Sequence, residues 1–428
     1  MTRRLFLAGS FLLLSLAVLS QEVANPKSEE LDAYVGAWSG TLKTGVLDLT
    51  LVLHIGVDEK GAATCTFDSP DQGAEGIAGE VVHLSSDSLM VSSKRISAVF
   101  AGHRSGDSIK GRFVQLLNGL PLTLYRGLPQ LNRPQTPVPP LPYTTEEVTF
   151  TNPDAGATFA GTLTYPNGYR ARRQKKVPVV LMVSGSGQQN RDEELMGHQP
   201  FRVISDYLAR HGIASLRYDD RGTGQSVGGR IDSVTTADFA QDALYGLRHL
   251  RQRGFKHVGV LGHSEGGNIA FIAGARGEAD FLISLAGAGV KGDTALTAQY
   301  NRTMELSGQP GRKSTAQYVA SVKGKGQPWL DYFLDYDPSD DLAAIHCPVM
   351  AVNGDKDCQV LWELNLEGIQ RHLPKNKRNI IKSYSGLNHL FQHCTTGAPT
   401  EYRQIEETFA VEVLDDIVQF IHQACKGR

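Results

Sequence analysis

The sequence predicts an α/β protein preceded by a small all-β domain, and two patterns carry this prediction. In residues 145–428, short apolar segments alternate with helical segments, which is typical of a mostly parallel sheet with helices on both faces. In residues 31–128, apolar and polar residues alternate with period two. Glycine-containing turns recur there at short intervals, which is typical of antiparallel strands in a small barrel or sandwich.

The size and charge of the chain narrow the function classes. The chain has 428 residues, enough for two or three domains, and its 41% hydrophobic and 21% charged residues are an ordinary globular balance. The formal net charge of −2 gives no strong field that would attract nucleic acid or an anionic membrane. We interpret the Lys and Arg residues within 170–176 as a solvated turn rather than a nucleic-acid patch.

The N-terminus has the layout of a secretory signal peptide. Arg3 and Arg4 precede an apolar run over residues 5–19, and small or neutral residues follow. The run is short for a helix that spans about 30 Å of hydrocarbon. We therefore expect cleavage after residues 1–20 and an exported bacterial protein, periplasmic or secreted, without stable membrane insertion. An uncleaved N-terminal anchor is the alternative.

The predicted all-β domain shows no catalytic constellation. Its histidines, His54, His83 and His103, are scattered, and we interpret them as ordinary surface or core residues rather than a metal site. Six prolines follow within residues 129–142, and this density favours an extended, semi-rigid spacer. We therefore place the domain boundary at residues 129–144.

The apolar segments of the C-terminal domain end in small or acidic residues. Residues 177–183 are followed by Ser-Gly-Ser-Gly, residues 257–261 by Gly262, and residues 349–352 by Asn-Gly-Asp. In a parallel sheet, active sites lie beyond the carboxyl ends of the strands, so these segments point to one site. Residues 290–345 interrupt the alternation with an aromatic-rich, partly helical stretch, which we expect to overhang the strand ends as a cap.

The strongest chemical signal is Gly262-His263-Ser264-Glu265-Gly266, a G-x-S-x-G pattern between an apolar strand and a helical segment. This context places the serine on a tight turn that projects its hydroxyl. Small residues on both sides allow the strand and the helix to approach closely. We therefore predict Ser264 as a nucleophile and the backbone N–H of Glu265 as an oxyanion donor.

A serine nucleophile needs a base, and the base needs an orienting acid. Downstream, the segment Asn353-Gly354-Asp355-Lys356-Asp357 offers two carboxylates. We favour Asp357 over Asp355 as the acid because it lies further into the loop. We favour His389 over His393 as the base because His389 directly follows a predicted strand and a Ser-Gly turn.

A second oxyanion donor is expected in the loop Ser184-Gly185-Ser186-Gly187-Gln188. The backbone N–H of Ser186 is our choice, and that of Gly187 is the alternative. The loop contains the G-x-G of dinucleotide-binding proteins, but Asn190 stands where their third glycine would be. The cysteines form no CxxC pair, so we predict no metal site. We also predict no organic cofactor, because a serine nucleophile with a base and an acid needs none.

Together these motifs resemble the α/β-hydrolase superfamily over residues 145–428. The resemblance implies the α/β-hydrolase fold with a helical cap, and a catalytic triad of Ser264, Asp357 and His389. It is fairly specific for the fold and the triad but says little about the substrate.

Three further segments resemble, more narrowly, the bacterial carboxylesterases of the serine-aminopeptidase-like type: Ser184–Gly187, Asp192-Glu193 and Arg217–Ser226. Many members have His-Gly at the oxyanion loop, whereas Ser184 stands at the histidine position here. Because the donor is a backbone N–H, activity need not suffer, but we expect the support of this loop to differ. The resemblance gives Arg217–Ser226 an architectural role.

The sequence thus favours a serine hydrolase that cleaves small carboxylic esters through an acyl-enzyme intermediate. Three alternatives stay open: a serine peptidase of the aminopeptidase type, a thioesterase or acyltransferase, and a non-catalytic binding protein of the cell envelope. An aminopeptidase would need cap carboxylates to hold the substrate amine, and Glu305, Asp331, Asp335 and Asp337 are available. The oligomeric state stays open.

Five cysteines occur, and export would permit disulfides among them. Cys358 and Cys394 follow the predicted acid and base at the same end of the sheet, whereas Cys347 and Cys425 lie at the opposite end. Topology therefore pairs Cys358 with Cys394 and Cys347 with Cys425, and leaves Cys65 alone. The alternative is that all five are reduced and pack as small hydrophobic side chains.

Overall fold

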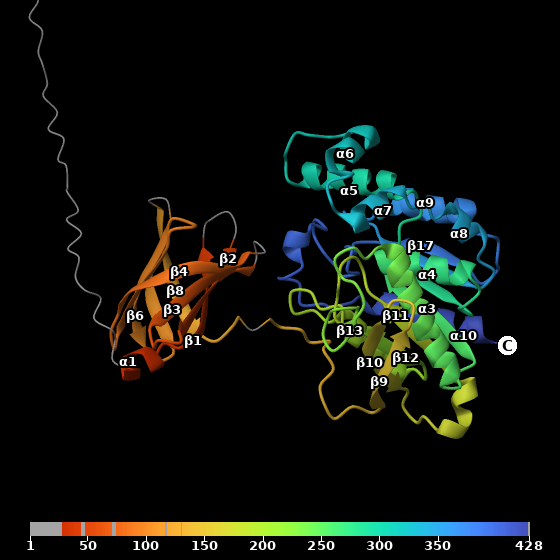
Figure 1. The fold of residues 1–428 in the computed structure, drawn as a ribbon, viewed down its shortest axis with the longest axis horizontal. Coiled ribbons are helices and arrows are strands. Elements are labelled where there is room, and N and C mark those ends of the chain that lie inside the picture. The colour runs from red at the N-terminus through yellow and green to blue at the C-terminus, as the bar shows by residue number, and fades with distance from the viewer. Residues whose placement is uncertain (1–27, 44–47, 71–73, 116–117, 130, 427–428) are drawn as a thin grey trace, which may run out of the picture. The chain divides into compact units, whose positions relative to one another are not determined.

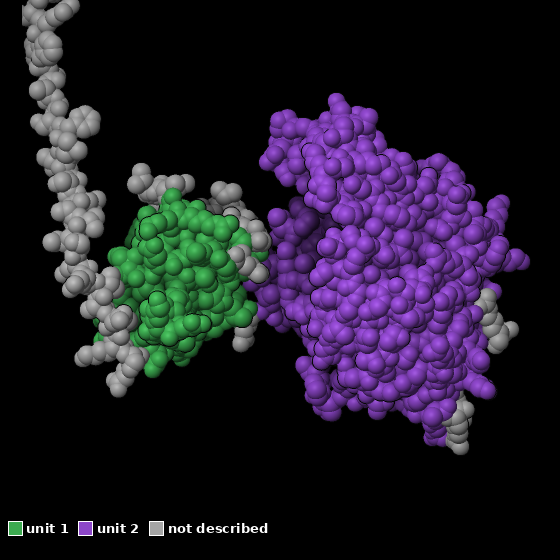
Figure 2. Space-filling model, viewed as in Figure 1, with its two compact units in different colours: residues 1–130 green, residues 131–428 purple. Residues whose placement is uncertain are grey.

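The chain folds as two units, residues 1–130 and residues 131–428, which Figure 2 shows in different colours. The computed structural model describes residues 28–43, 48–70, 74–115, 118–129 and 131–426. The predicted signal peptide, residues 1–20, lies outside the described residues. Among the described residues, no helix is both long and apolar enough to cross a membrane.

Unit 1 is a short helix followed by a closed barrel of eight antiparallel strands, which confirms the predicted small all-β domain (Figure 1). Each strand pairs with the next one in sequence, and the last strand pairs with the first. The elements are α1 (Ser28–Asp32), β1 (Gly36–Lys43), β2 (Asp48–Val57), β3 (Ala63–Ser69), β4 (Ala74–Leu84), β5 (Ser88–Ser93), β6 (Ala98–Ser105), β7 (Ser108–Gln115) and β8 (Asn118–Arg126).

Trp38 and Arg126 fasten the first strand of the barrel to the last. Trp38 is buried, and its indole N–H donates to the carbonyl oxygen of Tyr34 at 2.7 Å. The Arg126 guanidinium lies 4.3 Å from the centre of the indole ring and also donates to the carbonyl oxygens of Ala33 and Val35. Apolar side chains fill the interior so closely that the void among them measures only about 10 Å³.

Unit 2 is built on a nine-stranded sheet in the order β13-β10-β12-β11-β14-β15-β16-β17, with β9 paired to β10. The strands from β12 through β11 to β17 are parallel, and β9, β10 and β13 pair antiparallel at one side. The strands are β9 (Thr144–Asn152), β10 (Ala157–Tyr165), β11 (Pro178–Val183), β12 (Ala214–Tyr218), β13 (Val227–Gly228), β14 (His257–His263), β15 (Leu282–Leu285), β16 (Val349–Gly354) and β17 (Ile380–Tyr384).

Helices cover both faces of this sheet, because successive residues of a buried strand point to opposite sides. Val179 and Leu181 of β11 pack with residues of α3 and α4, whereas Val180 and Met182 pack with residues of α2 and α10. The helices of unit 2 are α2 (Pro200–Arg210), α3 (Thr236–Gln252), α4 (Glu265–Ala275), α5 (Gly292–Leu306), α6 (Thr315–Val322), α7 (Pro328–Asp335), α8 (Ser339–Ala343), α9 (Trp362–His372) and α10 (Val411–Cys425), with short 3₁₀ turns η2 (Ala171–Lys176) and η3 (Pro399–Glu401).

Between β15 and β16, the helices α5 to α8 interrupt the alternation of strand and helix. We call residues 290–345 the cap segment. Figure 1 shows α5, α6 and α7 gathered at one end of the sheet. The loops that carry the predicted site residues follow β11, β14, β16 and β17, at the carboxyl ends of neighbouring parallel strands.

Part of the proline-rich segment is anchored to unit 2. The Arg133 guanidinium donates to the carbonyl oxygens of Met196, Arg403 and Ile405 at 2.8 to 2.9 Å. The Gln135 amide donates to one backbone group of the loop before α10 and accepts from two others. Prolines prevent regular backbone pairing, but the side chains between them remain able to bind, so unit 2 begins structurally at residue 131.

Candidate active site

Ser264 lies on a strained turn between β14 and α4. Its backbone has φ 55° and ψ −120°, a conformation that residues other than glycine seldom adopt. Glycines make this turn possible. A Cβ on Gly262 would lie 1.9 Å from the Gly266 carbonyl oxygen, and one on Gly266 would lie 2.1 Å from the Val183 carbonyl oxygen. The G-x-S-x-G pattern is therefore a steric requirement of this strand–turn–helix junction.

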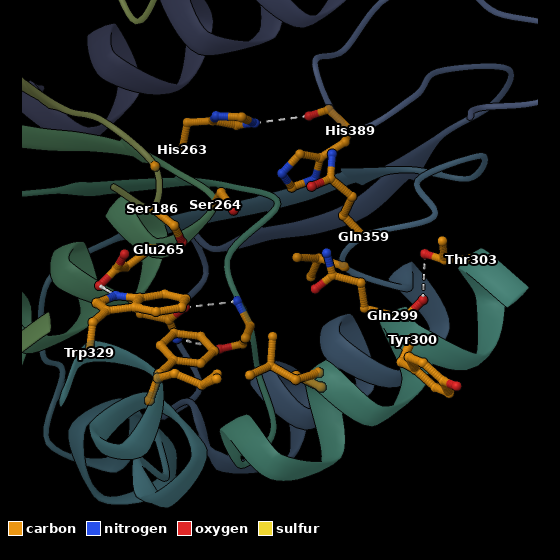
Figure 3. A pocket seen from close by; sticks show the side chains of 18 of the residues that line it. Ser186, His263, Ser264, Glu265, Gln299, Tyr300, Thr303, Trp329, Gln359 and His389 are labelled. Atoms are coloured by element: carbon orange, nitrogen blue, oxygen red, sulfur yellow. Dashed lines mark hydrogen bonds between the residues drawn. The ribbon is translucent and has the colours of Figure 1, made fainter. Parts of the chain in front are cut away.

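Ser264 faces a cavity of about 510 Å³ at the carboxyl ends of the strands, which we call the Ser264 cavity. The predicted residues Ser186, Glu265 and His389 also line it, together with side chains of the cap segment (Figure 3). Among the described residues, no group of three or more His, Cys, Asp or Glu side chains is placed to hold a metal ion.

Asp357 and His389 form a buried pair. Nδ1 of His389 lies 2.7 Å from Oδ2 of Asp357, and both side chains are almost fully buried. The backbone N–H groups of Gln359 and Val360 donate to the other carboxylate oxygen at 2.8 and 2.9 Å. Because the carboxylate accepts, Nδ1 carries the proton and Nε2 is left as the basic nitrogen. His389 and Ser264 line the same cavity without a hydrogen bond between them, and such bonds often tighten only when substrate binds.

The two alternative residues lie elsewhere. The Asp355 carboxylate accepts a hydrogen bond from the backbone N–H of Gly386 at 2.7 Å. It forms no hydrogen bond with His389. His393 is 56% exposed and pairs with Glu407 and Glu412. The acid and base loops therefore bring together the pair favoured from the sequence.

Asp220 supports the oxyanion loop after β11 through two hydrogen bonds. The sequence analysis gave this residue only the architectural role of its segment, Arg217–Ser226. The Ser184 hydroxyl donates to Oδ2 of Asp220 at 2.7 Å, and the backbone N–H of Gln189 donates to the same oxygen at 3.0 Å. The Ser184 side chain is thus held by the Asp220 carboxyl group. Burial raises the pKa of Asp220 to about 7, and these two hydrogen bonds oppose the shift.

Glu193 and His263 form a second buried pair that sequence reasoning did not assign. Oε1 of Glu193 accepts from Nδ1 of His263 at 2.9 Å and from the backbone N–H of Gly185 at 2.7 Å. Nε2 of His263 donates to the backbone carbonyl of His389 at 2.9 Å. Burial opposes charge on His263, but the Glu193 carboxylate outweighs it and raises the pKa of the imidazole. One ion pair therefore links the oxyanion loop, the nucleophile turn and the base loop.

The side chain of Glu265 ties the nucleophile turn to the cap segment. The indole N–H of Trp329, on α7, donates to Oε1 of Glu265 at 2.8 Å (Figure 3). Burial raises the pKa of Glu265, while the hydrogen bond from Trp329 opposes the shift. Glu265 therefore has two roles. Its backbone N–H follows Ser264 directly, and its side chain binds Trp329 of the cap segment.

The predicted bridge between Cys358 and Cys394 is not formed in the structure. Their thiols donate to the carbonyl oxygens of Gly397 and Gly386, at 3.3 and 3.4 Å. Burial raises the pKa of both thiols to about 11, which keeps them protonated at neutral pH. The Cys358 thiol therefore binds the acid loop to the segment after His389 by a hydrogen bond rather than by a cross-link, and the bond of Cys394 stays within the base loop. The pairing of Cys347 with Cys425 stays a prediction.

Two solved structures are among the similar ones. Est1E from Butyrivibrio proteoclasticus, with bound ferulic acid, aligns at 19% identity and a TM-score of 0.45, over 65% of this chain and 98% of its own. The Pyrococcus furiosus esterase Pf2001 aligns at 18% identity and a TM-score of 0.45, over 69% of this chain and 99% of its own.

A sequence comparison covers the turn that carries Ser264. Residues 199–317 match the family described as serine aminopeptidase, S33. The esterase EstD of Thermotoga maritima is 26% identical over 246 residues, which are 54% of this chain and 57% of EstD, so the chain spans less than two thirds of that relative. Ser264 lies inside the matched residues 199–317, on a turn whose glycines the backbone requires, and over this region the chain is similar to the serine aminopeptidase family, as it is elsewhere in this section to a bacterial esterase.

Proposed function

We propose that this protein is a serine hydrolase that cleaves neutral carboxylic esters through an acyl-enzyme intermediate. The observation that carries the proposal is the buried Asp357–His389 pair, which opens onto the same cavity as Ser264. A serine hydroxyl is a weak nucleophile, and a histidine whose tautomer is held by a carboxylate is the base that activates it.

In the first step, the Ser264 hydroxyl attacks the ester carbonyl while Nε2 of His389 takes its proton. Asp357 holds the imidazole tautomer and stabilises the imidazolium that forms. The carbonyl oxygen becomes an oxyanion, and the backbone N–H groups of Ser186 and Glu265 are our candidates to receive it. The helix dipole of α4, which begins at Glu265, adds a favourable field.

In the second half of the first step, the imidazolium returns its proton to the leaving alcohol, and Ser264 keeps the acyl group. Water then enters, His389 takes one of its protons, and the resulting hydroxide attacks the acyl-enzyme. The carboxylic acid leaves and Ser264 is reprotonated. No step requires a metal or an organic cofactor.

The lining of the Ser264 cavity favours neutral esters over aminopeptidase substrates. Its carboxylates, Glu193 and Glu265, are already bound to His263 and Trp329, so neither is available for a substrate amine. The acidic cap residues considered from the sequence do not line the cavity. Asp331 accepts a backbone N–H, and Asp335 pairs with Lys323.

The experiment that tests this proposal is labelling of the purified protein by a fluorophosphonate, followed by identification of the modified residue. We expect the label on Ser264. A parallel panel of p-nitrophenyl esters, acyl thioesters and aminoacyl anilides then separates the reaction classes, and we expect turnover of the esters above all. A protein that takes no label would be a binding protein instead.

We further propose that the protein acts outside the cytoplasm, because residues 1–20 have the layout of a secretory signal. Expression in a Gram-negative bacterium, followed by fractionation and mass measurement, tests this. We expect a periplasmic or secreted protein that has lost about 20 residues.

A further inference from the structure

The Ser264 cavity has two chemically different ends. Figure 3 shows Trp329 on one side of Ser264, together with Glu265, and shows Gln299 and Gln359 on the side of His389. Apolar side chains surround Trp329: its ring stacks on that of Phe333 at 5.4 Å, and Ala288, Ala295 and Leu296 belong to the same cluster. The lining also includes the polar uncharged side chains Gln299, Tyr300, Thr303 and Gln359, together with the apolar Val360 and Leu390.

The reaction itself decides which half of an ester occupies each end. His389 must protonate the oxygen of the leaving alcohol, so the alcohol lies beside this histidine. The acyl group, which stays on Ser264, then extends toward the opposite, apolar end. This assignment depends only on the direction of proton transfer.

The polar end offers hydrogen-bonding groups that are not used within the protein. Among the described residues, the Gln299 side-chain amide has no hydrogen-bond partner, and the Thr303 hydroxyl donates to the backbone carbonyl oxygen of Gln299 instead. The Gln359 amide donates to the Tyr402 hydroxyl at 3.1 Å, which leaves its carbonyl oxygen able to accept. Amide groups of this kind both donate to and accept from hydroxyls.

The described lining residues offer no unpaired charge that could recognise an ionic substrate. Of the described residues that line the Ser264 cavity, none is Lys or Arg, so neither of these side chains is available to bind a substrate carboxylate or phosphate. Its two carboxylates, Glu193 and Glu265, are engaged. The polar end therefore suits an alcohol that carries several hydroxyl groups and no charge.

We propose that the substrate is an ester between an apolar, uncharged acyl group and a hydroxyl-rich neutral alcohol, such as glycerol or a sugar. This inference rests on the proposed esterase function and adds the substrate class. Gln299 and Gln359 recognise hydroxyls of the alcohol, and Trp329, held by Glu265, forms the wall against which the acyl group packs.

The test compares two esters of the same acid whose alcohols have equal size: 1-monobutyrylglycerol and pentyl butyrate. We expect kcat/KM of the wild-type protein to favour the glycerol ester about 10-fold, because an alkyl alcohol leaves the amides of the polar end without partners. Gln299→Leu, which keeps the volume and removes both amide groups, should reduce this preference to about 2-fold or less. Gln359→Leu is the second variant and should act in the same direction.

Gln309→Leu is the matched control, because Gln309 is an exposed glutamine of the same cap segment that does not line the cavity. It should leave the preference unchanged. Trp329→Ala should change the preference between butyrate and acetate esters of one alcohol, but not the preference between the two alcohols.

Equal or reversed wild-type preference, or a preference that survives Gln299→Leu and Gln359→Leu, would overturn this inference while leaving the esterase function in place. Hydrolysis of neither ester by a protein that still takes the fluorophosphonate label would overturn it as well. Failure of hydrolysis and labelling together would remove the proposed function first.

Discussion

The two units of this chain use β-strands in opposite ways. In β3 of the barrel, buried and partly exposed residues alternate, so each strand turns one face inward. In β11 of unit 2, all six residues are buried, because helices cover both faces of the sheet. Apolar side chains fill the interior of the barrel and leave a void of about 10 Å³ among them, whereas in unit 2 a cavity of about 510 Å³ lies beyond the carboxyl ends of the strands.

This difference explains where chemistry can be placed. A closed antiparallel barrel packed with apolar side chains has no strand ends that converge on one point. A parallel sheet brings all its carboxyl ends to the same edge, and the loops there are free to carry polar groups. The comparison therefore places the proposed hydrolysis in unit 2 alone, and the following changes test this assignment.

Ser264→Ala should have the largest effect. Ester turnover should fall by several orders of magnitude, with a residual rate of about 10³-fold over water from the oxyanion hole and binding. Fluorophosphonate labelling should disappear. Ser307→Ala is the matched control, because Ser307 is an exposed serine of unit 2 that does not line the Ser264 cavity. Labelling of Ser264→Ala at the wild-type rate would move the nucleophile elsewhere.

His389→Ala should cost about as much as the loss of Ser264, because the members of a triad act as a unit. His393→Ala should have little effect, since this side chain is exposed and pairs only with Glu407 and Glu412. Steady-state kinetics on one activated ester compares the two. The reverse ranking would mean that the base is His393.

Glu193→Gln should have an intermediate effect. The variant removes the charge that holds His263, and with it the link between Gly185 and the base loop. We expect kcat to fall about 10-fold with a smaller change in KM, because a buried hydrogen-bonded ion pair is lost while the cavity lining is kept. Glu194→Gln, its exposed neighbour, serves as the control. An unchanged kcat would show that the Glu193–His263 pair does not position the site.

Asp220→Asn should change how the stability of unit 2 depends on pH. Its folded pKa, about 7, lies above the value of about 3.9 in an unfolded chain. Between these values the folded state binds more protons, so the free energy of unfolding falls as pH rises through this window. The variant should lose this part of the decline. Urea unfolding at pH 5 and pH 8 measures it, and equal pH dependence of both proteins would contradict it.

Removal of residues 1–130 should have the smallest effect on chemistry. A protein beginning at Leu131 keeps every proposed site residue and the anchors of Arg133 and Gln135. Hydrolysis of p-nitrophenyl acetate should remain within about 2-fold of the full-length rate, because every proposed catalytic residue lies in unit 2. A folded truncated protein without activity would end the assignment of catalysis to unit 2 alone.

Local patterns in the sequence were enough to predict much of this protein. Period-two alternation identified the small all-β domain, and buried apolar segments between helices identified the α/β fold. Ser264 was visible because its turn needs Gly262 and Gly266 within four residues. These features depend on sterics and periodicity between residues that are close in the chain, which is why they can be read without a structure.

Only the tertiary structure decided how the loops support one another. Glu193 binds His263 across 70 positions, His263 binds the His389 backbone across 126, and Trp329 reaches Glu265 across 64. The Glu193–His263 contact arises because the sheet places β14 next to β11, although α2, β12, β13 and α3 lie between them in the sequence. The division of the cavity into an apolar and a polar end has the same origin. Side chains from α5, α7 and the acid loop meet only after the strand order has brought their loops together.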